Sequence, residues 1–165
     1  MPTKATIDAA KRDKTQGKSA STQAGEFVKA EMDRIRKGQT GARNTKQAIA
    51  IGLSEARRAG VELKPPAKGK TSEKTRKNAE RELEKGKQHV PVNPRRSRAR
   101  EKVQQREGTE AASSKSLSKQ AKTAAQQRTP GERSSAAKQA SRTKGPAERS
   151  AAAKKAAHTR AQRAR

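Results

Sequence analysis

The sequence shows no arrangement of side chains that is typical of catalysis or of metal binding. The chain has no cysteine, and its two histidines, His89 and His158, lie in polar segments with no carboxylate or thiol at ligand spacing. A zinc site or a histidine general base needs such partner groups close by. We therefore interpret both histidines as solvated, and we expect no catalytic residue, no metal, no cofactor and no enzymatic activity.

Two short motifs look like the end of a phosphate-binding loop. Such a loop needs a glycine five residues before its Gly-Lys-Ser/Thr end, a strand before it and a helix after it. For Gly69-Lys70-Thr71 the earlier position holds Lys64, and no strand is predicted there. Gly17-Lys18-Ser19 fails the same test. We therefore do not expect nucleotide hydrolysis.

The overall charge points to a polyanionic partner. The 165 residues include 42 lysines and arginines against 16 acidic residues, which gives a net charge of +26 and a pI near 11.4. A chain of this charge attracts nucleic acid. A helix on a membrane surface needs Trp, Phe or Leu, and single-strand binders need aromatic stacking platforms. With one Phe and neither Trp nor Tyr, duplex DNA is the expected partner, structured RNA is an alternative, and no membrane is expected.

The basic residues expected to contact phosphates form three groups. The first lies on a predicted helix that follows Asn44, the second is an arginine cluster at 95–100, and the third is in the Ala-rich C-terminal segment. For the first group, a solvated helix face is an equally good interpretation. The residues are Lys46, Arg57 and Arg58; Arg95, Arg96, Arg98 and Arg100; and Lys138, Arg142, Lys144, Arg149, Lys154, Lys155 and Arg160.

Only one stretch of the chain can form a hydrophobic core. Ile, Leu, Val and Phe together make up 14 residues of the whole chain, and nine large apolar residues, counting Met, fall between Phe27 and Leu63. Highly charged chains with less than roughly 20% of these residues are usually disordered, because burial cannot offset the entropy of ordering. The sequence therefore predicts a mostly α and largely disordered chain with a small helical hairpin at about 23–60.

The hairpin is predicted from apolar spacing and from helix-end signals. Val28, Met32 and Ile35 recur on one face of a first helix over about 23–37, which Ser21 or Thr22 can cap. A Gly-containing turn at 38–41 follows. Asn44 can cap the second helix in a capping box with Gln47. Small residues on the second helix would let the two helices approach closely (Ala48, Gly52, Ala56, Ala59). Val61 and Leu63 could then fold back onto the apolar contact between the helices.

Gly60 stands where a left-handed residue would end the second helix. The predicted domain covers 23–66. A unit of this size without a disulfide or metal usually needs a partner surface, so a homodimer through the hairpin or ordering on nucleic acid is expected.

The other segments are expected to be arms and linkers. Residues 1–22 form a basic disordered arm with at most a transient helix at 7–14. Residues 67–108 form a charged linker with a marginal helix at 71–87 and the arginine cluster at 95–100. Residues 109–165 form an Ala/Lys/Arg-rich tail in which 130–140 is repeated at 146–156, sixteen residues on. Each copy opens with Pro and then Glu, which favours a helix N-terminus, so we expect latent helices.

The run NTKQAIAIGLSEARRAG over 44–60 resembles the signature of a small, uncharacterised bacterial domain family, (T/R)KQAIAIxLSEARRAG, and the resemblance covers about 26–64. It implies a helix, a turn and a second helix, in proteins that often carry an Ala/Lys tail and are labelled DNA-binding. Gly52 is a departure, since Ala is common there. The tail resembles linker-histone-like basic proteins in composition, although it is richer in Gln and Arg.

Together these features predict a non-enzymatic, nucleoid-associated DNA-binding protein that holds duplex DNA by its phosphates with little sequence specificity. The alternative is a protein-interaction module whose basic arms localise a partner on DNA or RNA, or a ribosome- or RNA-associated protein. The N-terminus lacks an apolar signal-peptide region and no segment reaches the length of a membrane span. We therefore expect a cytoplasmic protein located on the nucleoid.

Overall fold

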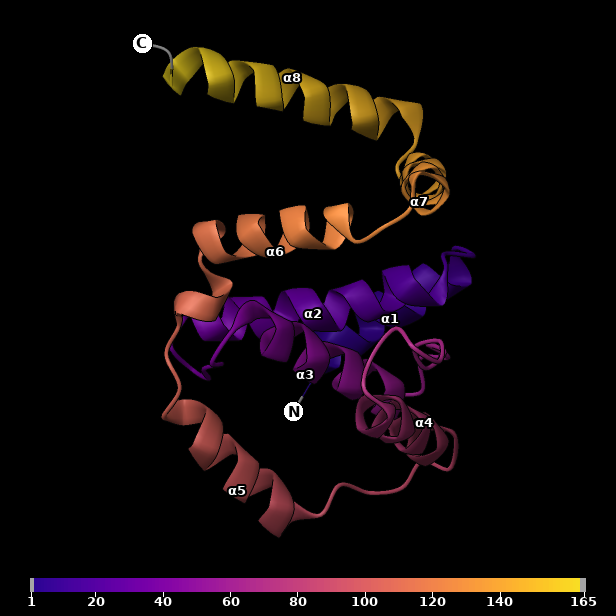
Figure 1. Cartoon of the computed structure of the whole chain (residues 1–165), viewed down its shortest axis with the longest axis vertical. Coiled ribbons are helices and arrows are strands. Elements are labelled where there is room, and N and C mark those ends of the chain that lie inside the picture. The colour runs from indigo at the N-terminus through magenta and orange to yellow at the C-terminus, as the bar shows by residue number, and fades with distance from the viewer. Residues whose placement is uncertain (1, 164–165) are drawn as a thin grey trace. The chain divides into compact units, whose positions relative to one another are not determined.

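The computed structural model describes residues 2–163, and all regular structure in that range is helical (Figure 1). A mostly α fold is therefore confirmed. The predicted disorder finds no support, because helices also cover the segments expected to be arms. The elements are α1 (Lys4–Thr15), α2 (Ala20–Arg36), α3 (Thr45–Arg58), α4 (Glu73–Lys87), α5 (Pro94–Gln105), the 3₁₀ turn η1 (Glu110–Ala112), α6 (Ser114–Gln126), α7 (Pro130–Thr143) and α8 (Pro146–Arg163).

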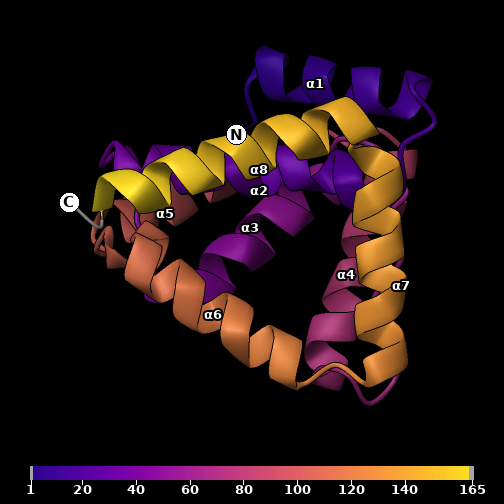
Figure 2. The same ribbon diagram turned by 90° about the horizontal axis from the view of Figure 1, so that it is seen from above.

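The chain divides into two units, residues 1–120 and residues 121–165. The helical hairpin is the centre of the first unit, and α2 lies between α1 and α3 (Figures 1 and 2). The first helix of the hairpin begins slightly earlier than the apolar spacing predicts, because its cap is Ser19, whose hydroxyl accepts from the Thr22 N–H. It ends at a left-handed Gly38, with a φ of 68°.

The second helix of the hairpin has the predicted ends. The Asn44 side chain accepts from the Gln47 N–H at 2.9 Å, and Gly60 has a φ of 89° with the Val61 N–H bonded back to Ala56 O. The reciprocal half of the capping box differs by one residue. The Gln47 side chain accepts from the Arg43 N–H instead of the Asn44 N–H.

The close approach of α2 and α3 occurs at Gly52. A Cβ at this position would lie 2.7 Å from the Val28 Cα, which is too close for any side chain. Around this contact the apolar residues form two clusters. One contains Met32, Ile35, Ala42, Ala48, Ala111 and Ala112, and the other contains Ala10, Ala24, Phe27, Ala56 and Val61, with Leu53 and Leu63 at its edge.

The N-terminal segment differs from the expected disordered arm. Thr3 caps α1 through the Thr6 N–H, and α1 packs on α2 with Ala10 buried and Ile7 against the second cluster. Asp13 is also buried and pairs with Lys18 at 2.8 Å. The physical reason is that Ala10 buries little area itself but allows the helix backbone to lie close to Ala24 and Phe27. A count of large apolar residues does not detect such a contact.

The charged helix α4 is docked on the C-terminal end of α3. A Cβ at Gly86 would lie 1.9 Å from the Arg57 carbonyl oxygen, so the two backbones touch at this point. Arg58 Nε and Glu82 Oε2 form an ion pair at 2.6 Å across the same interface. The expected marginal helix at 71–87 is therefore supported by tertiary contacts as well as by its own i, i+4 pairs.

A second docked segment comes from far along the chain. We call residues 107–117 the strap. The Ala42 N–H bonds to Gly108 O at 3.1 Å, and Thr45 Oγ1 donates to Ala111 O at 2.7 Å. Ala112 is fully buried against the first cluster, which Leu117 also contacts. The strap thus completes the core at the turn between α2 and α3.

The second unit carries the sequence repeat. Both copies begin a helix at their proline, α7 at Pro130 and α8 at Pro146. Thr129 and Glu132 form a capping box at the start of α7. Among the described residues, no helix is both long and apolar enough to cross a membrane.

Candidate nucleic-acid interface

The arginine cluster at 95–100 forms the helix α5. Asn93 caps it by accepting from the Arg96 N–H at 3.2 Å, and Pro94 occupies the first helical turn, where its missing N–H is not needed. Val90 to Asn93, which the prolines hold out of the helical conformation, separate it from α4. From the sequence we predicted an arginine cluster here, but no helix.

Four cations lie along one face of α5 and its C-terminal end. Arg95, Arg98, Lys102 and Arg106 are spaced i, i+3, i+7 and i+11. At about 100° per residue this places them within an arc of about 80°. All four are exposed, and within residues 2–163 none of their side chains makes a hydrogen bond or an ion pair. We call these four residues the cationic stripe.

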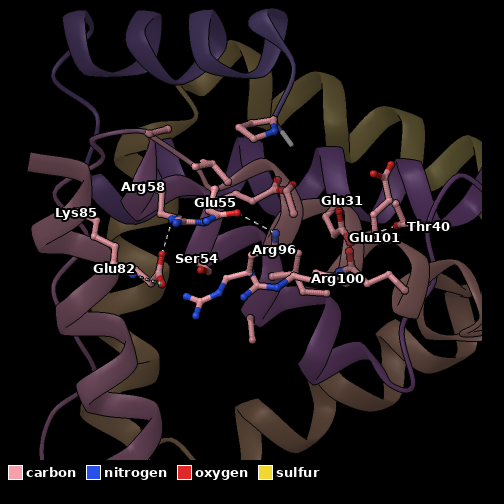
Figure 3. A pocket seen from close by; sticks show the side chains of 18 of the residues that line it. Glu31, Thr40, Ser54, Glu55, Arg58, Glu82, Lys85, Arg96, Arg100 and Glu101 are labelled. Atoms are coloured by element: carbon pink, nitrogen blue, oxygen red, sulfur yellow. Dashed lines mark hydrogen bonds and ion pairs between the residues drawn. The ribbon is translucent and has the colours of Figure 1, made fainter. Parts of the chain in front are cut away.

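The opposite face of α5 lines a groove. Arg96 and Arg100, one turn apart, face a cavity of about 810 Å³ whose far side is the outer face of α3, with Ile51 and Ser54 (Figure 3). The predicted arginine cluster is therefore divided by the helix. Arg96 and Arg100 line the groove, and Arg95 and Arg98 do not.

The groove is also lined by a buried Glu31 and a half-buried Glu55, and both are already paired. Arg34 forms an ion pair with Glu31 and donates to Glu55 at 2.7 Å, while Thr40 donates to Glu31 at 3.3 Å. Burial raises the pKa of Glu31, although Arg34 opposes this shift. Burial alone would lower the pKa of Arg34, but Glu55 and Glu31 together raise it. This cluster joins α2 to α3.

The three predicted contact residues on α3 have different surroundings. Lys46 is exposed and available. Arg58 is partly buried in its ion pair with Glu82. Arg57 is buried, its guanidinium donates to Leu63 O at 3.2 Å, and burial lowers its pKa. The returning segment 61–63 and the docked α4 cover this position, so Arg57 is a structural residue in this fold.

The predicted residues of the tail are all exposed on or beside α7 and α8: Lys138, Arg142, Lys144, Arg149, Lys154, Lys155 and Arg160. On α8, Arg149, Lys154 and Lys155 lie about 100° or more apart around the helix axis. They do not form one stripe. Their arrangement provides charge in all directions around the helix.

The described part of the chain contains no group of three or more His, Cys, Asp or Glu residues that could hold a metal ion. His89 and His158 are both exposed. Residues 11–69 match a family of unknown function, DUF6496. This match runs from within α1 to the residues beyond α3 and so contains the hairpin. Comparisons with curated proteins and with solved structures gave no match.

Proposed function

We propose that this protein is a non-enzymatic DNA-binding protein that holds duplex DNA through its phosphates with little sequence specificity. The observation that supports it best is the set of exposed cations on α5, α7 and α8, on helices with few acidic residues beside them. Residues 121–165 alone carry twelve lysines and arginines against two glutamates, a net charge of +10. Each phosphate contact by such a residue releases condensed counterions.

The likeness of 44–60 to the (T/R)KQAIAIxLSEARRAG signature and the linker-histone-like composition of the tail favour the same function. The signature and the tail composition are consistent with a cytoplasmic protein located on the bacterial nucleoid. The near absence of aromatic residues favours duplex over single-stranded targets, because single-strand binding relies on stacking.

The test is a salt titration of binding to two duplexes of unrelated sequence. We expect equal affinity for both and a steep fall with salt, at about −0.9 per phosphate neutralised in a log–log plot. Removal of residues 121–165 should make the slope clearly shallower. Strong preference for one duplex, or no binding near physiological salt, would contradict the proposal.

A second function is supported by the groove. Val90 and Val103 are 43% and 59% exposed, and both line it together with Ile51. Exposed apolar side chains around a hollow are typical of protein-binding surfaces. A protein-interaction module, localised on DNA or RNA by its basic segments, would become the better proposal if the full chain failed to bind duplex DNA.

A further inference from the structure

The helix α5 differs from α1 to α4 in how it is held. None of its residues is buried, from Pro94 to Gln105. An isolated helix of twelve residues is marginal in water, and Arg95 and Arg98 repel each other one turn apart. The position of α5 in the first unit must therefore come from the segments at its two ends.

The N-terminal end follows the docked helix α4. Gly86 lies against the Arg57 carbonyl, and Arg58 pairs with Glu82 at 2.6 Å. After α4 the Val90 N–H bonds back to Lys85 O at 3.0 Å, and the proline-restricted segment 91–94 leads into α5. The N-terminal end of α5 therefore lies only a few residues from the contacts that hold α4 on α3.

The C-terminal end runs directly into the strap. A Cβ at Gly41 would lie 2.0 Å from the Glu107 carbonyl oxygen, two residues after the end of α5. The Ala42 N–H and the Thr45 hydroxyl then hold Gly108 and Ala111. Both ends of α5 are thus tied to α3 or to the turn that precedes it, while α5 itself contributes no buried residue.

We propose that α5 is a discrete docking element for the backbone of duplex DNA, with the cationic stripe facing the phosphates and the two docked ends fixing its position. This inference rests on the proposed function and names the site within it. The stripe extends over eleven residues, about 16 Å at 1.5 Å per residue. Since phosphates follow one another at 3.4 Å of rise per strand, several lie within reach of its four cations.

The first experiment compares two full-length variants that lose the same charge. One is Arg95→Gln/Arg98→Gln/Lys102→Gln on the stripe, and the other is Arg149→Gln/Lys154→Gln/Lys155→Gln on α8. The measurement is duplex-DNA affinity across a salt series, with circular dichroism to confirm helicity. Neither set contains a buried residue, so both variants should fold.

The stripe variant should lose at least about tenfold in affinity and about 2.7 in salt slope, the value for three lost phosphate contacts. The α8 variant should lose clearly less than the stripe variant in both affinity and salt slope, because Arg149, Lys154 and Lys155 lie on different sides of their helix and cannot all face one duplex. Equal losses would overturn the discrete site while leaving phosphate binding intact. Absence of binding by the unmodified chain would overturn the proposed function itself. Equal affinity of the unmodified chain for duplex RNA would overturn the assignment to DNA.

The second experiment moves α5 without changing charge. Gly41→Ala places a methyl group against the Glu107 carbonyl, whereas Gly25→Ala, on the exposed side of α2, meets nothing within 4 Å. Release of the strap is read from faster hydrogen exchange of the Ala42 N–H. We expect Gly41→Ala to accelerate that exchange and to weaken DNA binding several-fold, and Gly25→Ala to do neither. Unchanged binding with the strap released would show that the position of α5 does not matter.

Discussion

At the scale of single residues, Gly52 shows how one position determines the geometry of the hairpin. Alanine would be the better helix former, by up to about 1 kcal/mol. The structure shows why glycine stands there, since any Cβ would meet the Val28 backbone at 2.7–2.9 Å. Backbone atoms cannot move aside as a flexible side chain can. Gly52 therefore lowers the helix propensity of α3 but allows α2 and α3 to pack closely.

Gly52→Ala should lower the free energy of unfolding by about 1–3 kcal/mol, because the added methyl overpacks the helix contact. Gly25→Ala is the matched control, also within a helix but exposed and with open space around it. It should raise stability by about 0.4–1 kcal/mol. Chemical denaturation measures the free energy of unfolding of both variants. A stabilising effect of Gly52→Ala would show that α3 does not approach the Val28 backbone closely at this position.

Glu31 links the stability of the hairpin to pH. Because burial raises its pKa, the folded state binds the proton more tightly than the unfolded state. This contribution to stability is fully present below the ordinary pKa near 4.5 and is lost as pH rises through the raised value. We therefore expect the stability of Glu31→Gln, relative to the unmodified protein, to improve between about pH 4 and pH 7.

Thermal unfolding at a series of pH values measures this difference. Glu26→Gln on the same helix is the control for the loss of a carboxylate that is not buried. A relative stability of Glu31→Gln that stays constant or falls with rising pH would mean that Arg34 outweighs burial at this carboxylate.

At the scale of elements, the strap supplies, from the same chain, a partner surface for the first apolar cluster of the hairpin. It covers Met32, Ile35 and Ala48 with Ala111, Ala112 and Leu117, from more than sixty residues further along the chain. The first cluster is thus complete within one molecule. A fragment that stops at the end of the DUF6496 match would leave this surface open to water.

We predict that residues 1–69 self-associate or unfold, whereas residues 1–120 form a folded monomer. The physical reason is the exposure of the first apolar cluster in the shorter fragment. Sedimentation velocity and circular dichroism distinguish these states. A stable monomeric 1–69 fragment, as soluble as 1–120, would show that the strap is dispensable.

Local signals in the sequence predicted the hairpin. The tertiary contacts that these signals did not predict are made at small residues. Asn44, Gly38 and Gly60 mark helix ends through the side chain or backbone conformation of a single residue, so they can be identified without knowledge of the fold. Ala10, Gly86 and Ala112 act through the distance between two backbones, which depends on the partner. The sequence placed Arg57 on a helix. It did not show that residues 61–63 and α4 cover this side chain, because that contact also depends on the fold.

The candidate interface was predicted in composition but not in arrangement. The spacing of Arg95, Arg98 and Lys102 is visible in the sequence once a helix is assumed, and Asn93-Pro94 is a signal for the start of one. The sequence does not show that both ends of α5 are docked. That docking depends on contacts of Gly86 with the Arg57 backbone and of Gly41 with the Glu107 backbone.

At the scale of the whole molecule, the chain combines a helical unit with an apolar core and a strongly cationic second unit. In residues 121–165 the net charge of +10 opposes compact structure. Helix α7 is capped by Thr129 and both helices begin at a proline, but none of their residues with a described side chain is buried. We therefore expect their helical state to depend on how far their charges are neutralised.

A peptide of residues 121–165 should therefore gain helicity when duplex DNA is added, and lose it again at high salt as the complex dissociates. Far-ultraviolet circular dichroism follows both steps. A peptide in which Glu132 and Glu148 are changed to Gln loses the first-turn acidic residues of α7 and α8 and should gain less. Equal helicity with and without DNA would show that the caps alone suffice.

The long sequence separation of the strap also affects synthesis of the protein. When residue 69 leaves the ribosome, α1, α2 and α3 can already pack together, but the strap that covers Met32 and Ile35 has not been made. At about 5–20 residues per second, its arrival takes several seconds more. During that interval the first apolar cluster lacks the residues that cover it in the finished chain, and transiently exposed apolar surface of this kind favours aggregation.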